Sequence, residues 1–151
     1  MSNGTVNSVA KAASVFHNAA NQLEKVRADT KTDANIDSAY LDETLGMMAG
    51  ATVLEALALE LVLKARLIRA GTRPPKWHSH SDLFALLPAA EQQDAEQVYQ
   101  ANRDPTTRAT LAEVLDLSAK AFERWRYHHE QPREPSLGEM QRAFSSLAAP
   151  L

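Results

Sequence analysis

Apolar residues recur every three or four positions along most of the chain, which is the spacing of one face of an α-helix. The first such stripe predicts a helix over Val6–Arg27, with apolar positions Val9, Ala13, Phe16, Ala20 and Leu23. A polar segment from Ala28 to Asp37 follows and predicts a loop. Asp37 or Ser38 is then expected to cap the next helix.

The second predicted helix, Ser38–Arg69, is apolar on more than one face between Leu54 and Leu67. Such a helix is expected at the centre of the fold, covered on several sides. Gly46 and Gly50 leave room for the close approach of another helix or for a local bend. Three charged residues interrupt the apolar run and argue against a membrane span: Glu55, Glu60 and Lys64.

The apolar stripes become shorter after the long helix. There, a glycine and two prolines predict a loop over residues 71–80. Ser79 or Ser81 is expected to cap a short helix, Asp82–Leu87, because serine accepts a hydrogen bond from the first helical turn. Pro88 ends that helix.

Two further helices are predicted on either side of a break at Asp104-Pro105. The first covers Ala90–Ala101 and is expected to turn Val98 and Tyr99 inward. The second begins near Thr106. Its apolar seam carries Leu111, Leu115, Ser118, Phe122, Trp125 and His129.

Two prolines mark the last break between predicted helices. Pro132 and Pro135 end the preceding helix, and Ser136 is expected to cap a final one, Leu137–Leu147. Valine, isoleucine, tyrosine and phenylalanine are too few for many strands, and no repeat or interdomain linker is present. We therefore expect residues 1–151 to form a single domain, an all-α bundle of about five to six helices.

Composition narrows the classes of function. The chain has 151 residues, no cysteine and a formal net charge of −3. Disulfides and thiolate metal sites are therefore excluded, and we expect a cytoplasmic protein. The first residues lack the basic start and apolar run of a signal peptide, in line with that expectation. The negative charge argues against broad nonspecific DNA binding, although a local basic site can still hold a phosphate.

The densest group of reactive side chains is Phe-Glu-Arg-Trp-Arg-Tyr-His-His-Glu at residues 122–130. Arginine binds phosphate through two hydrogen bonds, and histidine moves protons near neutral pH. On one straight helix, Arg124 and His128 lie about 40° apart and share a face, whereas Arg124 and His129 lie about 140° apart. This group is a candidate site for nucleotide or RNA chemistry.

Each candidate also has a purely structural interpretation. Arg126 and Glu130 would form an ordinary ion pair one turn apart, with the histidines at a helix end. Glu60 and Lys64 are likewise one turn apart on the long helix, and they predict an ion pair that faces a polar group across the bundle. Arg124 or Arg126 would be a suitable partner for Glu60.

The segment His78-Ser79-His80-Ser81-Asp82 alternates residue types that can ligate a metal. A closed site needs ligands from elsewhere in the chain, and serine and aspartate are common caps before a helix. We therefore predict no bound metal and no cofactor. The sequence also contains no Gly-rich phosphate loop, nucleophile elbow or His-Glu-x-x-His motif.

Three segments in order resemble the HEPN domain (higher eukaryotes and prokaryotes nucleotide-binding). Leu59–Ala65 lies toward the end of the long helix, and Ala121–Tyr127 lies in a late helix. Between them, His80–Pro88 looks like the family's histidine–aspartate–leucine element with one serine inserted. The resemblance covers roughly residues 40–130 and rests on the order and spacing of these segments.

The resemblance implies an all-α bundle, usually paired into a homodimer, and RNA cleavage in phage defence or toxin–antitoxin systems. RNA, a nucleotide and an antitoxin are thus the expected partners. Active ribonucleases of the family carry an arginine followed a few residues later by a histidine. Arg124 and His129, with four residues between them, fit that spacing. Two features depart from the family pattern. His128 is a second candidate for the reactive histidine, and Arg126 is the arginine that stands in the Trp-Arg-Tyr run.

We therefore expect a metal-independent endoribonuclease in which Arg124 stabilises the reacting phosphate and His129 moves a proton. Because these side chains diverge on one helix, the site is expected to need both protomers of a homodimer, with Thr106–Glu130 and the long helix near the two-fold axis. Expected supporting residues are Glu60, Lys64, Arg126, Tyr127, His128, His80 and Asp82. A noncatalytic HEPN-like module that binds RNA, a nucleotide or a protein is the alternative, and a purely structural dimer is a third possibility.

Overall fold

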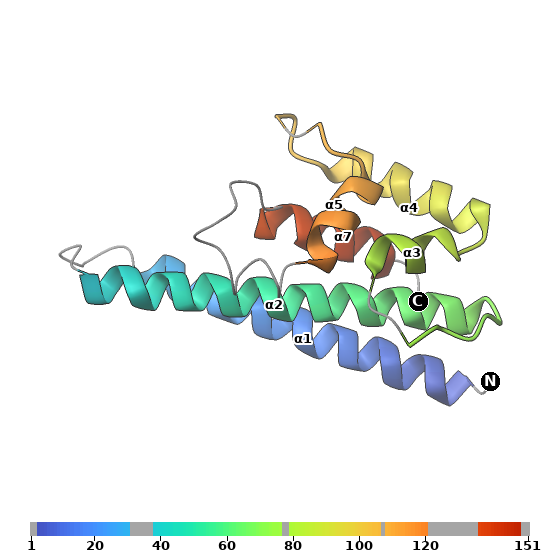
Figure 1. The fold of residues 1–151 in the computed structure, drawn as a ribbon, viewed down its shortest axis with the longest axis horizontal. Helices are drawn as coiled ribbons and strands as arrows, with labels where there is room; N and C mark the ends of the chain where they lie inside the picture. Colours follow the sequence, from blue (N-terminus) through green and yellow to red (C-terminus); the bar gives the residue numbers. More distant parts are fainter. Residues whose placement is uncertain (1–2, 31–37, 77–78, 107, 121–135, 149–151) are drawn as a thin grey trace.

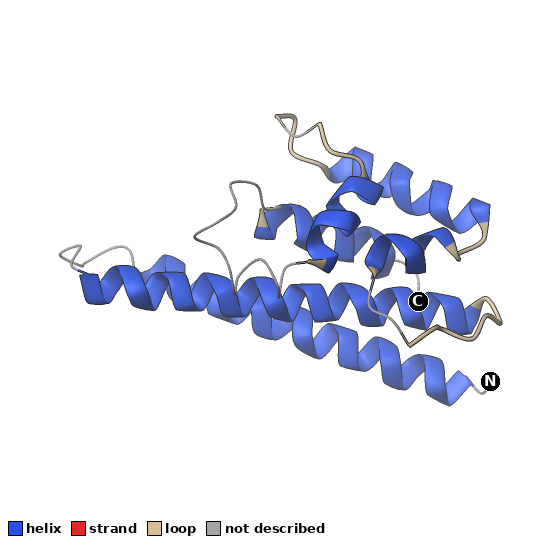
Figure 2. Ribbon diagram, viewed as in Figure 1, coloured by secondary structure: helices blue, strands red, loops and turns tan. Residues whose placement is uncertain are grey.

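The computed structural model describes residues 3–30, 38–76, 79–106, 108–120 and 136–148, and over these residues it contains six helices and no strand (Figure 2). The predicted all-α class is therefore confirmed. The helices are α1 (Asn3–Thr30), α2 (Ser38–Arg69), α3 (His80–Ala85), α4 (Ala89–Asn102), α5 (Leu111–Ala119) and α7 (Leu137–Ala148).

The helices form two layers. α1 and α2 make a long antiparallel hairpin, and α3, α4, α5 and α7 lie together on one side of α2 (Figure 1). α2 contacts α1, α3, α5 and α7, so the predicted central helix is confirmed. α4 lies farthest from the hairpin, where it packs on α7 and α5.

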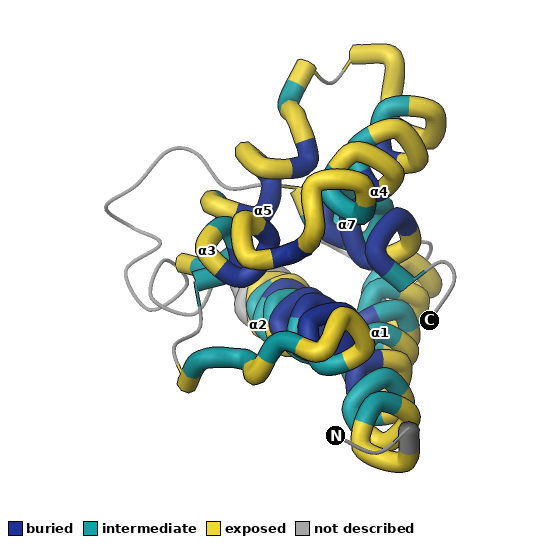
Figure 3. Tube along the Cα trace, turned by 90° about the vertical axis from the view of Figure 1, so that its right-hand side faces the viewer, coloured by how far each residue is buried: buried dark blue, intermediate teal, exposed yellow. Residues whose placement is uncertain are grey.

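The core lies between α2 and the second layer. Figure 3 shows buried positions concentrated along α2 and on the inner sides of the helices around it. Burial of these side chains supplies the main stabilising free energy, at about 25 cal/mol per Å² of apolar surface. The largest fully buried apolar side chains are Leu59, Val62, Leu63 and Leu67 of α2, Leu83 of α3, Tyr99 of α4, Leu111, Val114 and Leu115 of α5, and Met140 and Leu147 of α7.

Where a strong local signal marks a helix end, the predicted boundary is confirmed. α2 begins at Ser38 and ends at Arg69, as predicted. Gly71 follows with a φ of 79°, a left-handed conformation that suits glycine, and the Thr72 N–H donates to the carbonyl of Leu67 at 2.8 Å. Ser136 caps α7: its hydroxyl accepts from the Glu139 N–H at 3.2 Å.

The predicted boundaries of two helices, α1 and α3, are wrong. α1 extends through Ala28 to Thr30, although those residues were predicted to be loop, because nothing there breaks the helix. α3 begins at His80, two residues before the predicted Asp82, and Ser79 is its cap. Ser81 therefore lies inside the helix.

The region around Asp104 holds two more corrections. Val98 is exposed (39%), and its neighbour Tyr99 alone is fully buried. Asp104 Oδ1 accepts from the Thr106 N–H at 2.8 Å, which forms a turn in place of the predicted helix start. α5 begins at Leu111 instead, where Thr110 and Glu113 form a reciprocal capping box. Of the predicted seam, Leu111, Leu115 and Ser118 are buried as expected; Phe122, Trp125 and His129 lie outside the described residues.

One described segment, Glu43–Arg69 of α2, is long and apolar enough to cross a membrane. The core helix of a soluble protein meets the same criterion, and α2 contacts four other helices here. Length and composition do not distinguish the two settings, so the absence of a membrane span stays a prediction.

The two glycines of α2 differ in their surroundings and predict different mutational effects. A Cβ on Gly50 would lie 3.3 Å from Cδ1 of Leu23 on α1, whereas a Cβ on Gly46 would have no neighbour within 4 Å. Gly46→Ala is expected to raise the free energy of unfolding by about 0.5–1 kcal/mol through helix propensity. Gly50→Ala should gain less, because Leu23 must move. Urea denaturation measures both, and an equal or larger gain for Gly50→Ala would contradict this account.

Candidate functional site

The structure describes four of the predicted site residues: Glu60, Lys64, His80 and Asp82. The candidate pair Arg124 and His129, and the supporting residues Arg126, Tyr127 and His128, lie outside the described residues.

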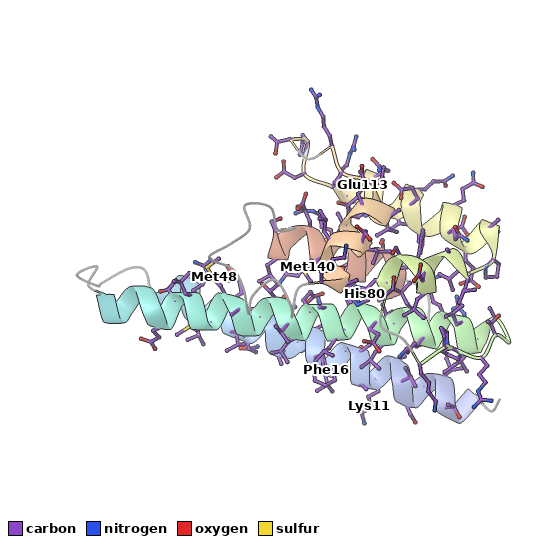
Figure 4. All side chains as sticks on the ribbon, in the orientation of Figure 1. Lys11, Phe16, Met48, His80, Glu113 and Met140 are labelled. Atoms are coloured by element: carbon purple, nitrogen blue, oxygen red, sulfur yellow. The ribbon has the colours of Figure 1, made fainter. Side chains whose placement is uncertain are left out.

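His80 is the first residue of α3 and is almost completely buried (3% exposed; labelled in Figure 4). Its Nδ1 lies 2.8 Å from the hydroxyl of Ser118, in the last turn of α5. The Ser118 hydroxyl donates its one proton to the Leu115 carbonyl at 3.0 Å. Nδ1 of His80 is therefore the donor to Ser118, and in the neutral ring Nε2 carries the lone pair. The contact fixes the start of α3 against the end of α5.

Asp82 does not join this contact. Its side chain is exposed, and its backbone N–H donates to the Ser79 hydroxyl at 3.3 Å. His80 and Asp82 thus lie on different sides of α3, one buried and one exposed to solvent. Of the two, His80 is the residue whose side chain joins α3 to α5.

The His80 contact predicts a difference between two buried serines. In Ser118→Ala, Nδ1 of His80 loses its acceptor, and the free energy of unfolding is expected to fall by about 1–3 kcal/mol. Ser146 is the matched control, because it is also buried and donates to the carbonyl three residues earlier, at 2.8 Å. Ser146→Ala should change stability by only about 0.5 kcal/mol. Equal losses in urea denaturation would show that the His80 bond contributes nothing.

Glu60 and Lys64 form the predicted ion pair on α2. Lys64 Nζ donates to Glu60 Oε1 at 2.6 Å, and both side chains are largely buried. The prediction of an ion pair is confirmed. The expected contact between Glu60 and an arginine of the 122–130 group falls outside the described residues.

An open groove lies between Ser81 of α3 and the residues at the start of α5. It has a volume of about 750 Å³ and is lined by Ser81, Arg108, Ala109, Ala112, Glu113, Asp116 and Leu117. Hydrogen bonds from the backbone N–H and hydroxyl of Thr110 hold the Glu113 carboxylate and lower its pKa. Arg108 and Asp116 give the groove both signs of charge. Helix periodicity alone did not identify it, because its residues come from two helices and a loop.

The structure also contains a buried polar network that the sequence did not reveal. Nδ1 of His17 on α1 lies 2.9 and 3.0 Å from the two carboxylate oxygens of Glu55 on α2, whose side chain is fully buried. Asn21 lies 3.0 Å from Nε2 of His17, and Gln141 of α7 donates to Asn21 at 2.6 Å. The His17 ring stacks on Phe144 of α7, with ring centres 4.2 Å apart.

Glu55 was the signal that could have led to this network. A carboxylate within a long apolar run needs a partner, yet the sequence pattern does not say which residue on another helix provides one. Burial raises the pKa of Glu55, and the hydrogen bond and charge of His17 oppose that change. His17 and Glu55 are 38 positions apart in the sequence.

Within the ranges that the structure describes, no group of three or more histidine, aspartate and glutamate side chains is arranged to hold a metal ion. Comparison with protein-family models, with curated proteins and with solved structures gives no match for this chain.

Proposed function

We propose that the protein is a HEPN-like, metal-independent endoribonuclease that uses Arg124 and His129. The observation that supports this most is the bond between His80 and Ser118 at 2.8 Å. It ties the HEPN-like element of α3 to the last turn of α5, and Arg124 follows only six residues after Ser118 in the sequence. His80–Pro88 is thus held against the helix that directly precedes Ala121–Tyr127 in the sequence.

The chemistry follows from the residue types. A ribonuclease without a metal needs a group that moves the proton of the 2′-hydroxyl or of the leaving oxygen, and histidine does this near neutral pH. Negative charge grows on the phosphate in the transition state, and the guanidinium of Arg124 would stabilise it through two hydrogen bonds. Attack by the 2′-hydroxyl leaves a 2′,3′-cyclic phosphate on one product and a 5′-hydroxyl on the other.

We further propose that the working protein is a homodimer, because helical periodicity would set Arg124 and His129 about 140° apart on one straight helix, too far around it to share a site. α2 offers an apolar surface that suits such an interface: Leu57 is 41% exposed, and Val53 and Leu61, one turn away on either side, are half-buried. Burial of such a stripe against its symmetry mate removes apolar surface from water. Light scattering at tens of micromolar protein should report a dimer; a monomer would remove the composite site.

The direct experiment is incubation of the purified protein with single-stranded and structured RNA in EDTA. We expect cleavage that leaves 2′,3′-cyclic phosphate ends, with a DNA oligonucleotide of the same sequence as the control, because DNA lacks the attacking hydroxyl. Cleavage that EDTA abolishes would contradict the metal-independent mechanism. Intact RNA after prolonged incubation would contradict ribonuclease activity itself.

A noncatalytic HEPN-like binding or dimerisation module is the second candidate. The observation in its favour is that His80 and the Glu60–Lys64 pair are engaged in contacts within the bundle. This function uses the same arginines and makes no demand on His129. Thermal unfolding with RNA and with nucleotides separates the two, because a binding module is stabilised by RNA that it leaves intact. In either case we expect a cytoplasmic setting, with an antitoxin as a possible protein partner.

A further inference from the structure

The outer face of α5 borders the open groove. Ser81 of α3 and residues 108–109 line the rest of it. The volume of about 750 Å³ falls within the range of about 300–1,000 Å³ that is typical of sites for drug-sized ligands. The groove therefore has room for a short chain segment. The α5 residues that line it are Ala112, Glu113, Asp116 and Leu117.

Asp116 stands at an electrostatically unfavourable position on this face. It lies in the last turn of α5, where the free carbonyl groups carry partial negative charge and the turn contains no basic residue. Glu113 (labelled in Figure 4) lies one turn earlier, so the two carboxylates repel each other. Lys120 follows one turn later and is exposed, yet Asp116 makes no ion pair over the described part of the chain. A cation from another molecule would therefore stabilise the Asp116 carboxylate.

The remaining groups of the groove add one more acceptor, one donor and an apolar surface. The N–H and hydroxyl of Thr110 occupy Oε2 of Glu113, at 2.7 and 3.0 Å. Oε1 of Glu113 has no hydrogen bond to any described residue, so it is a second acceptor beside Asp116. The exposed Arg108 supplies the donor. The apolar surface comes from Ala109, Ala112 and Leu117.

We propose that this groove binds a basic, amphipathic segment of a partner protein. A lysine or arginine of the segment pairs with Asp116, and an apolar side chain beside it covers Leu117 and Ala112. Charge complementarity selects this occupant, because two carboxylates face a single arginine and the excess negative charge repels RNA and nucleotides. The Arg108 guanidinium donates to carbonyl oxygens of the segment. A simple polyamine would leave Leu117 uncovered.

This docking surface does not depend on the proposed ribonuclease activity, and its test uses no RNA. A random peptide library displayed on phage is selected against the immobilised full chain. We expect the enriched sequences to carry lysine or arginine within a few positions of leucine, isoleucine or phenylalanine. Enrichment of acidic sequences, or no enrichment at all, would contradict the proposal.

Titration of an enriched synthetic peptide into variants then tests the site itself. Asp116→Lys should weaken binding about tenfold or more. Leu117→Ser should weaken it about fivefold, and Lys120→Gln, which removes a competing cation, should tighten it about twofold. The matched control is Asp94→Lys, which reverses an exposed aspartate of α4 outside the groove and should leave affinity unchanged. Equal affinities in Asp116→Lys and Asp94→Lys overturn the proposal.

Two measurements exclude the other occupants. A peptide whose apolar residues are replaced by serine should lose binding, and full retention would show that the groove takes a simple cation. If Asp116→Lys converts a dimer to a monomer in light scattering, the occupant is a second copy of this chain. Either result overturns the proposal.

The free protein provides a readout that needs no peptide. Asp116→Asn should raise the Tm by about 1–4 °C, because it removes an anion from the end of α5. A lower Tm would show that the chain itself stabilises this carboxylate, and the reason to expect an external cation would be lost.

Discussion

Replacement of Arg66 by methionine is expected to lower the free energy of unfolding by about 3–5 kcal/mol. Arg66 of α2 is 4% exposed, and it connects three helices. Its Nε donates to the carbonyl of Leu147 at the end of α7, and its Nη1 donates to Glu91 of α4 at 3.0 Å. Methionine fills similar space but leaves the buried Leu147 carbonyl without this donor and Glu91 without its nearest cation.

Arg69 provides the matched control for this substitution. It lies one turn away on α2 and contacts the same Glu91 oxygen at 3.5 Å, but it is 36% exposed. Arg69→Met should therefore cost about 1 kcal/mol or less. Burial lowers the pKa of Arg66, with Glu91 opposing the change, and the group nevertheless stays charged at neutral pH. If urea denaturation gives the two variants equal free energies of unfolding, the buried hydrogen bonds of Arg66 stabilise the fold no more than the exposed contact of Arg69 does.

Much of the fold could be predicted from the sequence because its strongest signals are local. Asp37 or Ser38 after a polar segment identified the start of α2, and Gly71 with two prolines behind it identified the end. The serine cap of α7 was equally clear, since Ser136 precedes Glu139 at capping-box spacing. These residues decide their own backbone hydrogen bonds, so no knowledge of the tertiary structure is needed.

The errors arose where two local signals competed. Thr106 follows a proline, a common start of a helix, yet the Asp104 side chain captures its N–H first. Thr110 then supplies a better cap, and α5 begins there. Val98 and Tyr99 illustrate the other limit: both are apolar neighbours in α4, and only packing against other helices determines which one is buried.

The candidate site was predictable only in part. The Glu60–Lys64 pair follows from spacing on one helix, and it is present. The contacts of His80 with Ser118 and of His17 with Glu55 each join residues 38 positions apart, and helical periodicity holds no information about such pairs. In both cases the partner of the histidine lies on another helix, which only the tertiary fold brings near.

The second large effect concerns the proposed catalytic pair. Arg124→Ala is expected to reduce the rate of RNA cleavage by about 10²–10³-fold, through loss of transition-state charge stabilisation. Arg124→Lys should recover only part of this loss, because an ammonium group cannot bind phosphate through the planar fork of arginine. Arg73→Ala removes the same charge from an exposed loop and should leave the rate unchanged. A similar loss in Arg73→Ala would indicate general electrostatic attraction of RNA in place of a specific site.

The proposed ribonuclease is tested most directly by single-turnover cleavage of RNA in EDTA by the wild type, His129→Ala and His128→Ala. If His129 transfers the proton, its removal should slow cleavage by about 10²–10⁴-fold, whereas His128→Ala should retain a rate near that of the wild type. Circular dichroism of each variant checks that the helices are intact. Cleavage that continues at the wild-type rate in His129→Ala would contradict the assignment of Arg124 and His129 as the catalytic pair.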